Sequence, residues 1–129
     1  MTELKDLSPK FRHVRLLLAR GKGNPVGDPG EGYDLLVPLD QDNRLDAADW
    51  KTHQTHCRVR WFAADGDERI GRLRRKPGGQ WYFDYDENGD RDDEPAYRLG
   101  DERFVVGEYV SVAHEGEMRT YQVARVEKP

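Results

Sequence analysis

The sequence predicts a mainly β protein: a small, antiparallel, partly open β-barrel with one short α-helix. Three observations support this fold class. Apolar residues come in short runs that alternate with polar ones, glycine and proline separate the runs, and one segment alone carries the signals of a helix. Many short strands at such spacing are typical of barrels and sandwiches. With 129 residues the chain has the length of one ordinary domain, so we expect residues 1–129 to form a single domain.

The N-terminal third predicts two strands separated by a long loop. Residues 1–10 show no periodic apolar pattern, so we expect a loose tail. Residues 11–20 and 33–39 are the two strands. Residues 21–32 between them contain five glycines and two prolines, which predicts an irregular loop. This segment lacks the lysine and hydroxyl ending of a P-loop, which favours an ordinary loop over a phosphate cradle.

One segment predicts a helix over about residues 47–56. Asp46 can cap its N-terminus, and Asp49 follows three residues later, at the position where a capping box places Glu or Gln. Leu45 and Trp50 occupy the two positions of a hydrophobic staple. We expect Trp50 to lie on the apolar face of this helix.

After the helix the apolar pattern has a period of two residues, which predicts antiparallel strands. Residues 58–62 form one strand, and residues 69–76 and 80–85 form a hairpin around Pro77-Gly78-Gly79. In the register that a three-residue loop with a left-handed Gly79 imposes, most pairs match in chemistry. The expected pairs are Leu73–Phe83, Arg75–Trp81 and Arg72–Asp84.

The last third predicts two short strands and a hairpin. Residues 97–99 and 104–106 are the short strand candidates. Residues 108–114 and 117–126 form the hairpin, which turns at Glu115-Gly116. In its register Val110 lies opposite Tyr121, and Ser111 lies opposite Thr120 on the outer face.

Composition excludes several classes of protein. The net charge of −4 argues against a dedicated nucleic-acid binder, whose domain is usually basic. Cys57 is the single cysteine, so no internal disulfide can form. No apolar run has the length of a signal peptide core or a membrane span, so we expect a cytoplasmic protein with no membrane partner.

The sharpest local pattern is the acidic segment 84–94. Its carboxylates and amide alternate and a glycine follows, as in the first half of a calcium loop; the candidate metal ligands are Asp84, Asp86, Asn88, Asp90 and Asp92. The position of the bidentate glutamate falls on Pro95, and a strand precedes the loop, so the segment is not an EF-hand. Calcium as a cofactor is therefore one hypothesis, and a tight Asn88-Gly89 turn in a solvated loop is the favoured one.

A second metal pattern lies at the end of the predicted helix. His53 and His56 share a helix face, and the thiolate of Cys57 could add a ligand for zinc. A fourth ligand would have to come from a distant residue such as His13 or His114. A histidine near a helix C-terminus is also explained by the helix dipole alone, which favours a structural role.

Basic side chains near aromatic ones on the predicted strands form a third candidate site, for single-stranded nucleic acid or another partner. Its members are Arg58, Arg60, Arg72, Arg74, Arg75, Lys76, Trp61 and Tyr82. The expected pairing of Arg72 with Asp84 neutralises part of this face, and the acidity of the chain counts against nucleic acid. A protein or a small ligand is therefore the expected partner.

Four stretches, residues 14–20 (VRLLLAR), 27–34 (GDPGEGYD), 71–79 (GRLRRKPGG) and 107–112 (GEYVSV), carry a resemblance that covers most of the chain. Together they resemble a family of short, uncharacterised bacterial proteins. That family has no established activity, so the resemblance implies no site residues. The final hairpin also resembles the strand pairs of SH3-like barrels, which implies a barrel and nothing about function.

Patterns for nucleophilic catalysis are weak in this sequence. Ser8 and Ser111 are not in a nucleophile-elbow setting, and Cys57 is too close in sequence to its histidines for the alignment that attack requires. We therefore expect a non-catalytic binding or interaction domain rather than an enzyme. Calcium binding at residues 84–94 and single-stranded nucleic-acid binding along residues 58–76 are the alternatives.

Overall fold

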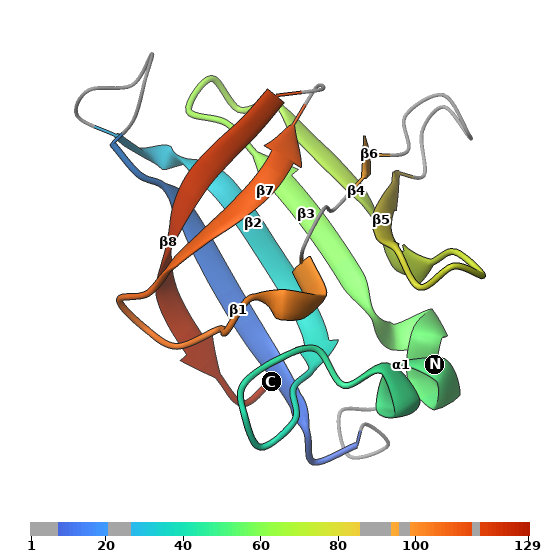
Figure 1. Ribbon diagram of the computed structural model, residues 1–129. Coiled ribbons are helices and arrows are strands. Elements are labelled where there is room, and N and C mark those ends of the chain that lie inside the picture. The colour runs from blue at the N-terminus through green and yellow to red at the C-terminus, as the bar shows by residue number, and fades with distance from the viewer. Residues whose placement is uncertain (1–7, 21–26, 86–93, 96–98, 115–116) are drawn as a thin grey trace.

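The computed structural model describes residues 8–20, 27–85, 94–95, 99–114 and 117–129. The strands are β1 (Phe11–Leu18), β2 (Asp28–Pro38), β3 (Arg58–Phe62), β4 (Glu68–Arg75), β5 (Trp81–Tyr85), β6 (Glu94–Pro95), β7 (Tyr109–His114) and β8 (Glu117–Glu127). The helical elements are α1 (Ala47–His53) and the two short 3-10 helices η2 (Gln54–His56) and η4 (Leu99–Asp101). Figure 1 shows the strands wrapping around a common interior, with α1 at one end.

The eight strands form one antiparallel sheet in the order β6-β5-β4-β3-β2-β1-β8-β7. Strands that follow each other in the chain are neighbours from β1 to β6, and β8 pairs with the free side of β1. The sheet therefore curls into a half-barrel, and its two edge strands, β6 and β7, approach each other along the open seam. The predicted mainly β, partly open barrel with one short helix is confirmed.

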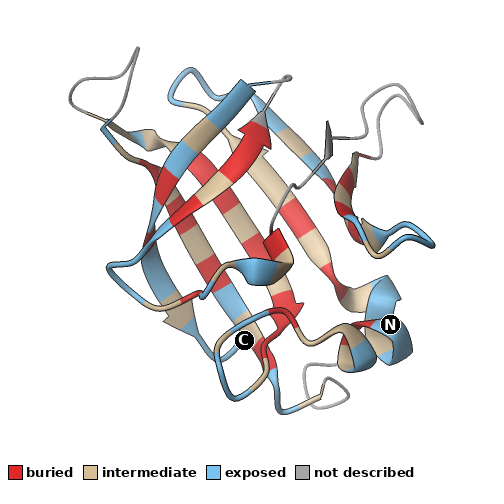
Figure 2. Cartoon of the chain, viewed as in Figure 1, coloured by how far each residue is buried: buried red, intermediate tan, exposed pale blue. Residues whose placement is uncertain are grey.

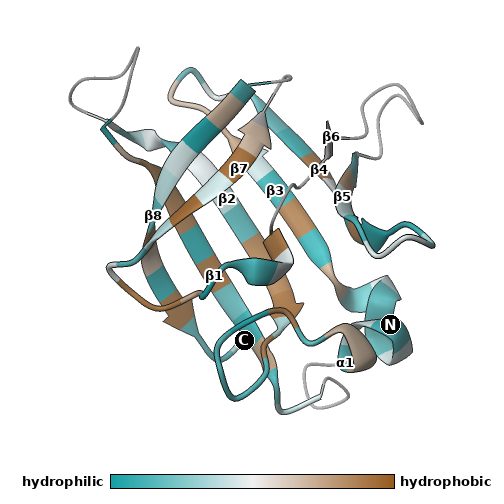
Figure 3. Cartoon of the chain, in the orientation of Figure 1, coloured by the Kyte–Doolittle hydropathy of each residue, from teal (hydrophilic) through white to brown (hydrophobic). Residues whose placement is uncertain are grey.

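Inward-facing side chains fill the interior of the curled sheet. Tyr33 on β2 lies at its centre, with its ring centroid 5.5 Å from that of Phe83 and 5.2 Å from that of Tyr121. Buried and less buried residues alternate along β1, β2 and β5, as Figure 2 shows. The hydropathy colours of Figure 3 follow this alternation only in part, because Leu17 and Leu36 on the less buried side are apolar as well. Burial of these apolar faces is the main stabilising term of such a fold.

The helix α1 packs across the barrel end where β4 finishes. Asp46 caps it, because its carboxylate accepts a hydrogen bond from the Asp49 amide at 3.0 Å. The buried Trp50 donates its indole N–H to the Leu73 carbonyl at 2.9 Å and contacts Trp81 edge to face. The predicted helix is thus found, with its last three residues in the tighter 3-10 form of η2. No helix in the described part of the chain has the length and apolarity needed to cross a membrane.

The predicted hairpin registers are confirmed. In β4–β5 the pairs are Leu73–Phe83, Arg75–Trp81 and Arg72–Asp84, and in β7–β8 they include Val110–Tyr121 and Ser111–Thr120. Gly79 has the left-handed conformation that the three-residue loop requires, with φ at 91°.

Strand β2 begins at Asp28, five residues before the predicted start, so part of the glycine-rich segment is strand and not loop. Glycine makes strand pairing possible in this segment, although many glycines usually indicate a loop. A Cβ on Gly32 would collide with the carbonyl oxygen of Leu16 on β1, so only glycine permits this close pairing. The register shifts between Leu17 and Leu18, which accommodates the irregular start of β2.

Residues 104–106 are not a strand, contrary to the prediction. Phe104 is buried, and its amide donates a hydrogen bond at 2.8 Å to the carbonyl of Asn43, far away in sequence. Phe104 therefore belongs to the buried core without extending the sheet. Leu99 likewise begins η4 rather than a strand, while residues 97 and 98 lie outside the described residues.

Candidate functional site

Strand β4 carries arginines on both of its faces near α1. Side chains alternate along a strand, so Leu73 and Arg75 share one face, and Arg72 and Arg74 lie on the other. Leu73 is buried in the core, which identifies its side as the inner one. Gly71 allows β5 to lie close to β4 here, because a Cβ at this position would collide with the carbonyl of Asp84. The end of β4 thus presents positive charge to two separate pockets.

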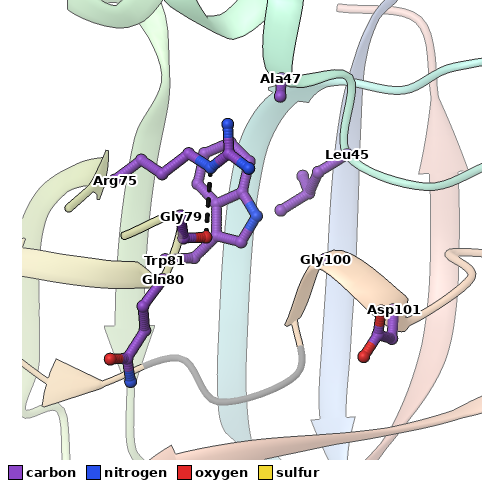
Figure 4. A pocket seen from close by; sticks show the side chains of 8 residues that line it. All are labelled: Leu45, Ala47, Arg75, Gly79, Gln80, Trp81, Gly100 and Asp101. Carbon is purple, nitrogen blue, oxygen red and sulfur yellow. Dashed lines mark hydrogen bonds between the residues drawn. The ribbon is translucent and has the colours of Figure 1, made fainter. Parts of the chain in front are cut away.

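The larger pocket has a volume of about 400 Å³ and lies between α1, the β4–β5 turn and η4. We call it the Trp81 pocket; its lining residues are Leu45, Ala47, Arg75, Gly79, Gln80, Trp81, Gly100 and Asp101. The guanidinium of Arg75 lies 5.2 Å from the centroid of the Trp81 ring, and its Nε donates a hydrogen bond to the Gly79 carbonyl at 3.2 Å. Figure 4 shows the Arg75 side chain extended across the indole, with Leu45 pointing toward the same ring.

The backbone of η4 completes the Trp81 pocket. A Cβ on Gly100 would lie only 2.9 Å from the indole nitrogen of Trp81, so the chain passes the ring edge more closely than a side chain would allow. Trp81 is consequently held between Arg75 and η4, and it is only 5% exposed. The pocket therefore combines an aromatic ring, aliphatic side chains, one guanidinium and the carboxylate of Asp101.

The smaller pocket has a volume of about 100 Å³ and lies on the outer face between η2 and β4. We call it the Thr55 pocket; its lining residues are Gln54, Thr55, Arg72, Leu73 and Arg74. Asp84 lies opposite Arg72 in the register, as predicted, but its carboxylate is 2.7 Å from Nε of Arg74 instead. The Arg72 side chain makes no hydrogen bond or ion pair within the described residues.

The other residues of the predicted basic site do not form one surface with these arginines. Arg58 lies opposite Arg72 in the β3–β4 register. Lys76 lies with its ammonium 5.5 Å from the ring centroid of the half-buried Tyr82. Trp61 pairs in register with Tyr33 and packs against the core, so it does not share the outer surface with these residues.

Arg60 belongs to an ion-pair network on the outer face of β1–β4. Its Nη1 donates to Asp34 at 3.0 Å and its Nε to Glu68 at 2.7 Å, while Arg15 donates to both oxygens of Asp34 at 2.8 and 3.0 Å. Burial alone would raise the pKa of Asp34, but the hydrogen bonds and charges of Arg15 and Arg60 outweigh it and leave that pKa lowered. Arg60 therefore links β2, β3 and β4 through its ion pairs with Asp34 and Glu68.

The predicted calcium loop is represented in the described residues by Asp84 alone. Asp86, Asn88, Asp90 and Asp92 lie outside them. The carboxylate of Asp84 is already engaged by Arg74. Calcium binding at this segment therefore stays a prediction.

The histidines and the cysteine of the predicted zinc pattern lie at the α1–η2 junction. The rings of His53 and His56 stack with centroids 6.2 Å apart, and His53 meets Phe11 edge to face. Cys57 is buried with its thiol 3.6 Å from the His53 carbonyl, and burial, helped by the charge of Asp49, raises the pKa of this thiol to about 12. Among the residues that the structure describes, no three His, Cys, Asp or Glu side chains are grouped to hold a metal ion. Cys57 is accordingly a protonated core residue at neutral pH.

Sequence reasoning missed an ion pair on the inner face of the barrel. Arg119 on β8 donates to Glu31 on β2 at 2.6 Å, and both side chains are largely buried. Burial, together with the charge of Glu31, raises the pKa of the neighbouring Tyr121 to about 12. The alternation of side chains along the strand indicated that Arg119 points inward, because it stands two residues before the inward-facing Tyr121.

Three arginines of the predicted basic site therefore line the two pockets at the end of β4. Arg75 belongs to the Trp81 pocket, and Arg72 and Arg74 belong to the Thr55 pocket. The resemblance to a family of short bacterial proteins stays a prediction, as does the likeness to SH3-like barrels. The chain matches no protein-family model, no curated protein and no solved structure.

Proposed function

We propose that this protein is a non-catalytic binding domain and that its ligand occupies the Trp81 pocket. The observation that carries the proposal is the guanidinium of Arg75 lying 5.2 Å from the ring of Trp81 at the wall of a 400 Å³ pocket. Pockets of this volume are within the usual range for small ligands, and the mouth of a β-barrel is a common place for them.

The chemistry of the lining favours a carboxylate-bearing ligand with a flat apolar body. Arg75 presents a planar fork of donors that matches a carboxylate. The aliphatic side chains of Leu45 and Ala47 and the edge of the Trp81 ring supply an apolar surface for the rest of the molecule. The Gly79 carbonyl occupies only the Nε donor of Arg75, so the terminal nitrogens are available to a ligand.

Binding rather than catalysis suits the ionisable groups of this pocket. Arg75 and Asp101 are the charged residues among its lining, and an arginine does not release its proton to act as a general acid or base. Asp101 is the lining residue that could carry a proton, and the lining includes no serine, threonine, cysteine, lysine or histidine to act with it. This set of side chains supports binding better than catalysis.

Three ring compounds that differ in charge test the proposal: benzoate, benzamide and benzylamine. We expect benzoate to bind with saturable shifts of the backbone amides of Arg75, Trp81 and Gly100 in NMR titrations. Benzamide should bind more weakly, because it lacks the charge that pairs with Arg75. An Arg75→Ala variant should weaken benzoate binding about fivefold and remove the preference for benzoate over benzamide.

Arg125→Ala is the matched control, because Arg125 is an exposed arginine of β8 whose Nε lies 3.4 Å from Glu127. It should leave benzoate binding unchanged. The proposal is wrong if the three compounds bind equally, or if benzoate binds as well to the Arg75→Ala variant as to the unmodified protein. A preference for benzylamine would also contradict it, since that preference would assign recognition to Asp101.

A further inference from the structure

We propose that the Thr55 pocket is a binding subsite for a tetrahedral oxyanion of the phosphate class. It is formed by Arg72, Arg74, Gln54 and Thr55 on the outer face of the barrel. This inference is independent of the proposed ligand of the Trp81 pocket, because Arg72 and Arg75 lie on opposite faces of β4.

The balance of charge around the pocket favours an anion. Arg72 and Arg74 both line it, and within the described part of the chain the Asp84 carboxylate forms an ion pair with Arg74 but not with Arg72. The Arg72 side chain makes no hydrogen bond or ion pair within the described residues, so an anion in the pocket would supply its guanidinium with an acceptor.

The size of the pocket and the donors on its other wall also fit an oxyanion. The pocket has a volume of about 100 Å³, against about 400 Å³ for the Trp81 pocket, so a small ligand such as a tetrahedral oxyanion suits it better than a large one. On the η2 side, Thr55 offers a hydroxyl, and Gln54 offers the second proton of an amide whose first is donated to the Lys51 carbonyl at 3.3 Å. Neutral donors facing guanidinium groups are a common arrangement around bound phosphate.

Titration with inorganic phosphate tests the subsite directly. With chloride used to hold the ionic strength constant, we expect saturable NMR shifts confined to Gln54, Thr55, Arg72 and Arg74. An Arg72→Gln variant should weaken phosphate binding about fivefold, since a guanidinium contact to an anion is replaced by a neutral amide. Arg125→Gln, on the far side of the sheet, should bind phosphate as the unmodified protein does.

Two further measurements separate this inference from the proposed ligand of the Trp81 pocket. Arg72→Gln should bind benzoate normally, and Arg75→Ala should bind phosphate normally. Shifts that grow linearly with phosphate and never saturate would overturn the subsite, and so would equal affinity of Arg72→Gln and the unmodified protein.

The source of the oxyanion is distinguished by a second pair of probes, phenyl phosphate and a ten-residue oligothymidylate. Tighter binding of the oligonucleotide than of inorganic phosphate, with strong salt dependence and loss in Arg72→Gln, would identify a nucleic-acid backbone. Tighter binding of phenyl phosphate, again lost in Arg72→Gln, would identify the terminal phosphate of a small molecule. Oligonucleotide binding that survives in Arg72→Gln would contradict a role of this pocket in holding a backbone phosphate.

Discussion

Two arginine clusters lie on the outer face of the same sheet, and they differ in how their charge is balanced. The paired cluster consists of Arg15 and Arg60 with Asp34 and Glu68, and its four side chains are joined by ion pairs. The open cluster consists of Arg72 and Arg74 with Asp84, whose carboxylate lies 2.7 Å from Nε of Arg74 and forms no ion pair with Arg72. The same residue type is therefore held by ion pairs in one place, and in the other we propose that it binds a ligand.

The position of the carboxylate explains this difference. Asp34 lies between two arginines, is 12% exposed, and accepts three hydrogen bonds from them. The Phe62 ring adds a surface for both guanidinium groups, whose centres lie 5.2 and 5.0 Å from its centroid. The paired cluster is thus satisfied within the fold, whereas the open cluster retains donors for a partner from solution.

The largest expected effect is on stability and follows the loss of Asp34. An Asp34→Asn variant removes the charge that Arg15 and Arg60 share, and its amide can accept fewer of their hydrogen bonds. We expect the free energy of unfolding to fall by about 2 kcal/mol, as measured by urea denaturation followed by tryptophan fluorescence.

Asp84→Asn is the matched control for this substitution. Asp84 is also an aspartate of the outer face, but it is 28% exposed and contacts Arg74 alone among the described residues. Its loss should cost less than about 1 kcal/mol. Equal losses for the two variants would show that the paired cluster has no special structural role.

The stabilisation by the paired cluster should depend on pH in a defined direction. The pKa of Asp34 is lowered in the folded protein, so its ionised form contributes stability above the pKa of the unfolded chain. That contribution is lost as the pH falls through the folded pKa. We therefore expect the stability difference between the unmodified protein and Asp34→Asn to be constant above about pH 5 and to shrink below about pH 4. A difference that widens toward low pH would contradict the ion pairs.

Removing one arginine from each cluster should give a smaller but direct contrast. Arg60→Ala loses ion pairs to two carboxylates and should lower the free energy of unfolding by about 1 kcal/mol. Arg72→Ala loses none within the described residues and should change it by less than about 0.5 kcal/mol. The same urea denaturation measures both, and a larger loss for Arg72→Ala would assign that residue to the fold.

The sequence was sufficient to predict the framework of both clusters. The alternation of apolar residues and the Pro-Gly-Gly turn predicted the β4–β5 register, because side-chain period and turn chemistry constrain each other. For the same local reasons Asp46 and Trp50 predicted the helical segment 47–56, of which α1 lines the Trp81 pocket and η2 lines the Thr55 pocket. Patterns of this kind act over a few residues and are visible in a single chain.

The partners of individual charges could not be predicted in the same way. Asp84 faces Arg72 in the register but contacts Arg74, since long side chains also reach diagonal neighbours. Phe104 was expected in a strand, and its contact with Asn43 joins segments that no local pattern connects. Gly32 was expected in a loop, but it lies in β2, where the backbone of β1 leaves no room for a side chain. That close approach exists only in the folded sheet.

The smallest expected effect links the open cluster to its proposed ligand. Asp84 competes with an oxyanion for Arg74 and repels it, so Asp84→Asn should raise the affinity for inorganic phosphate about two- to threefold. Asp34→Asn is the informative control, because it frees guanidinium groups that line no part of the Thr55 pocket. If both variants gain affinity equally, phosphate responds to the general charge of the barrel; a gain confined to Asp84→Asn locates its binding beside Arg72 and Arg74.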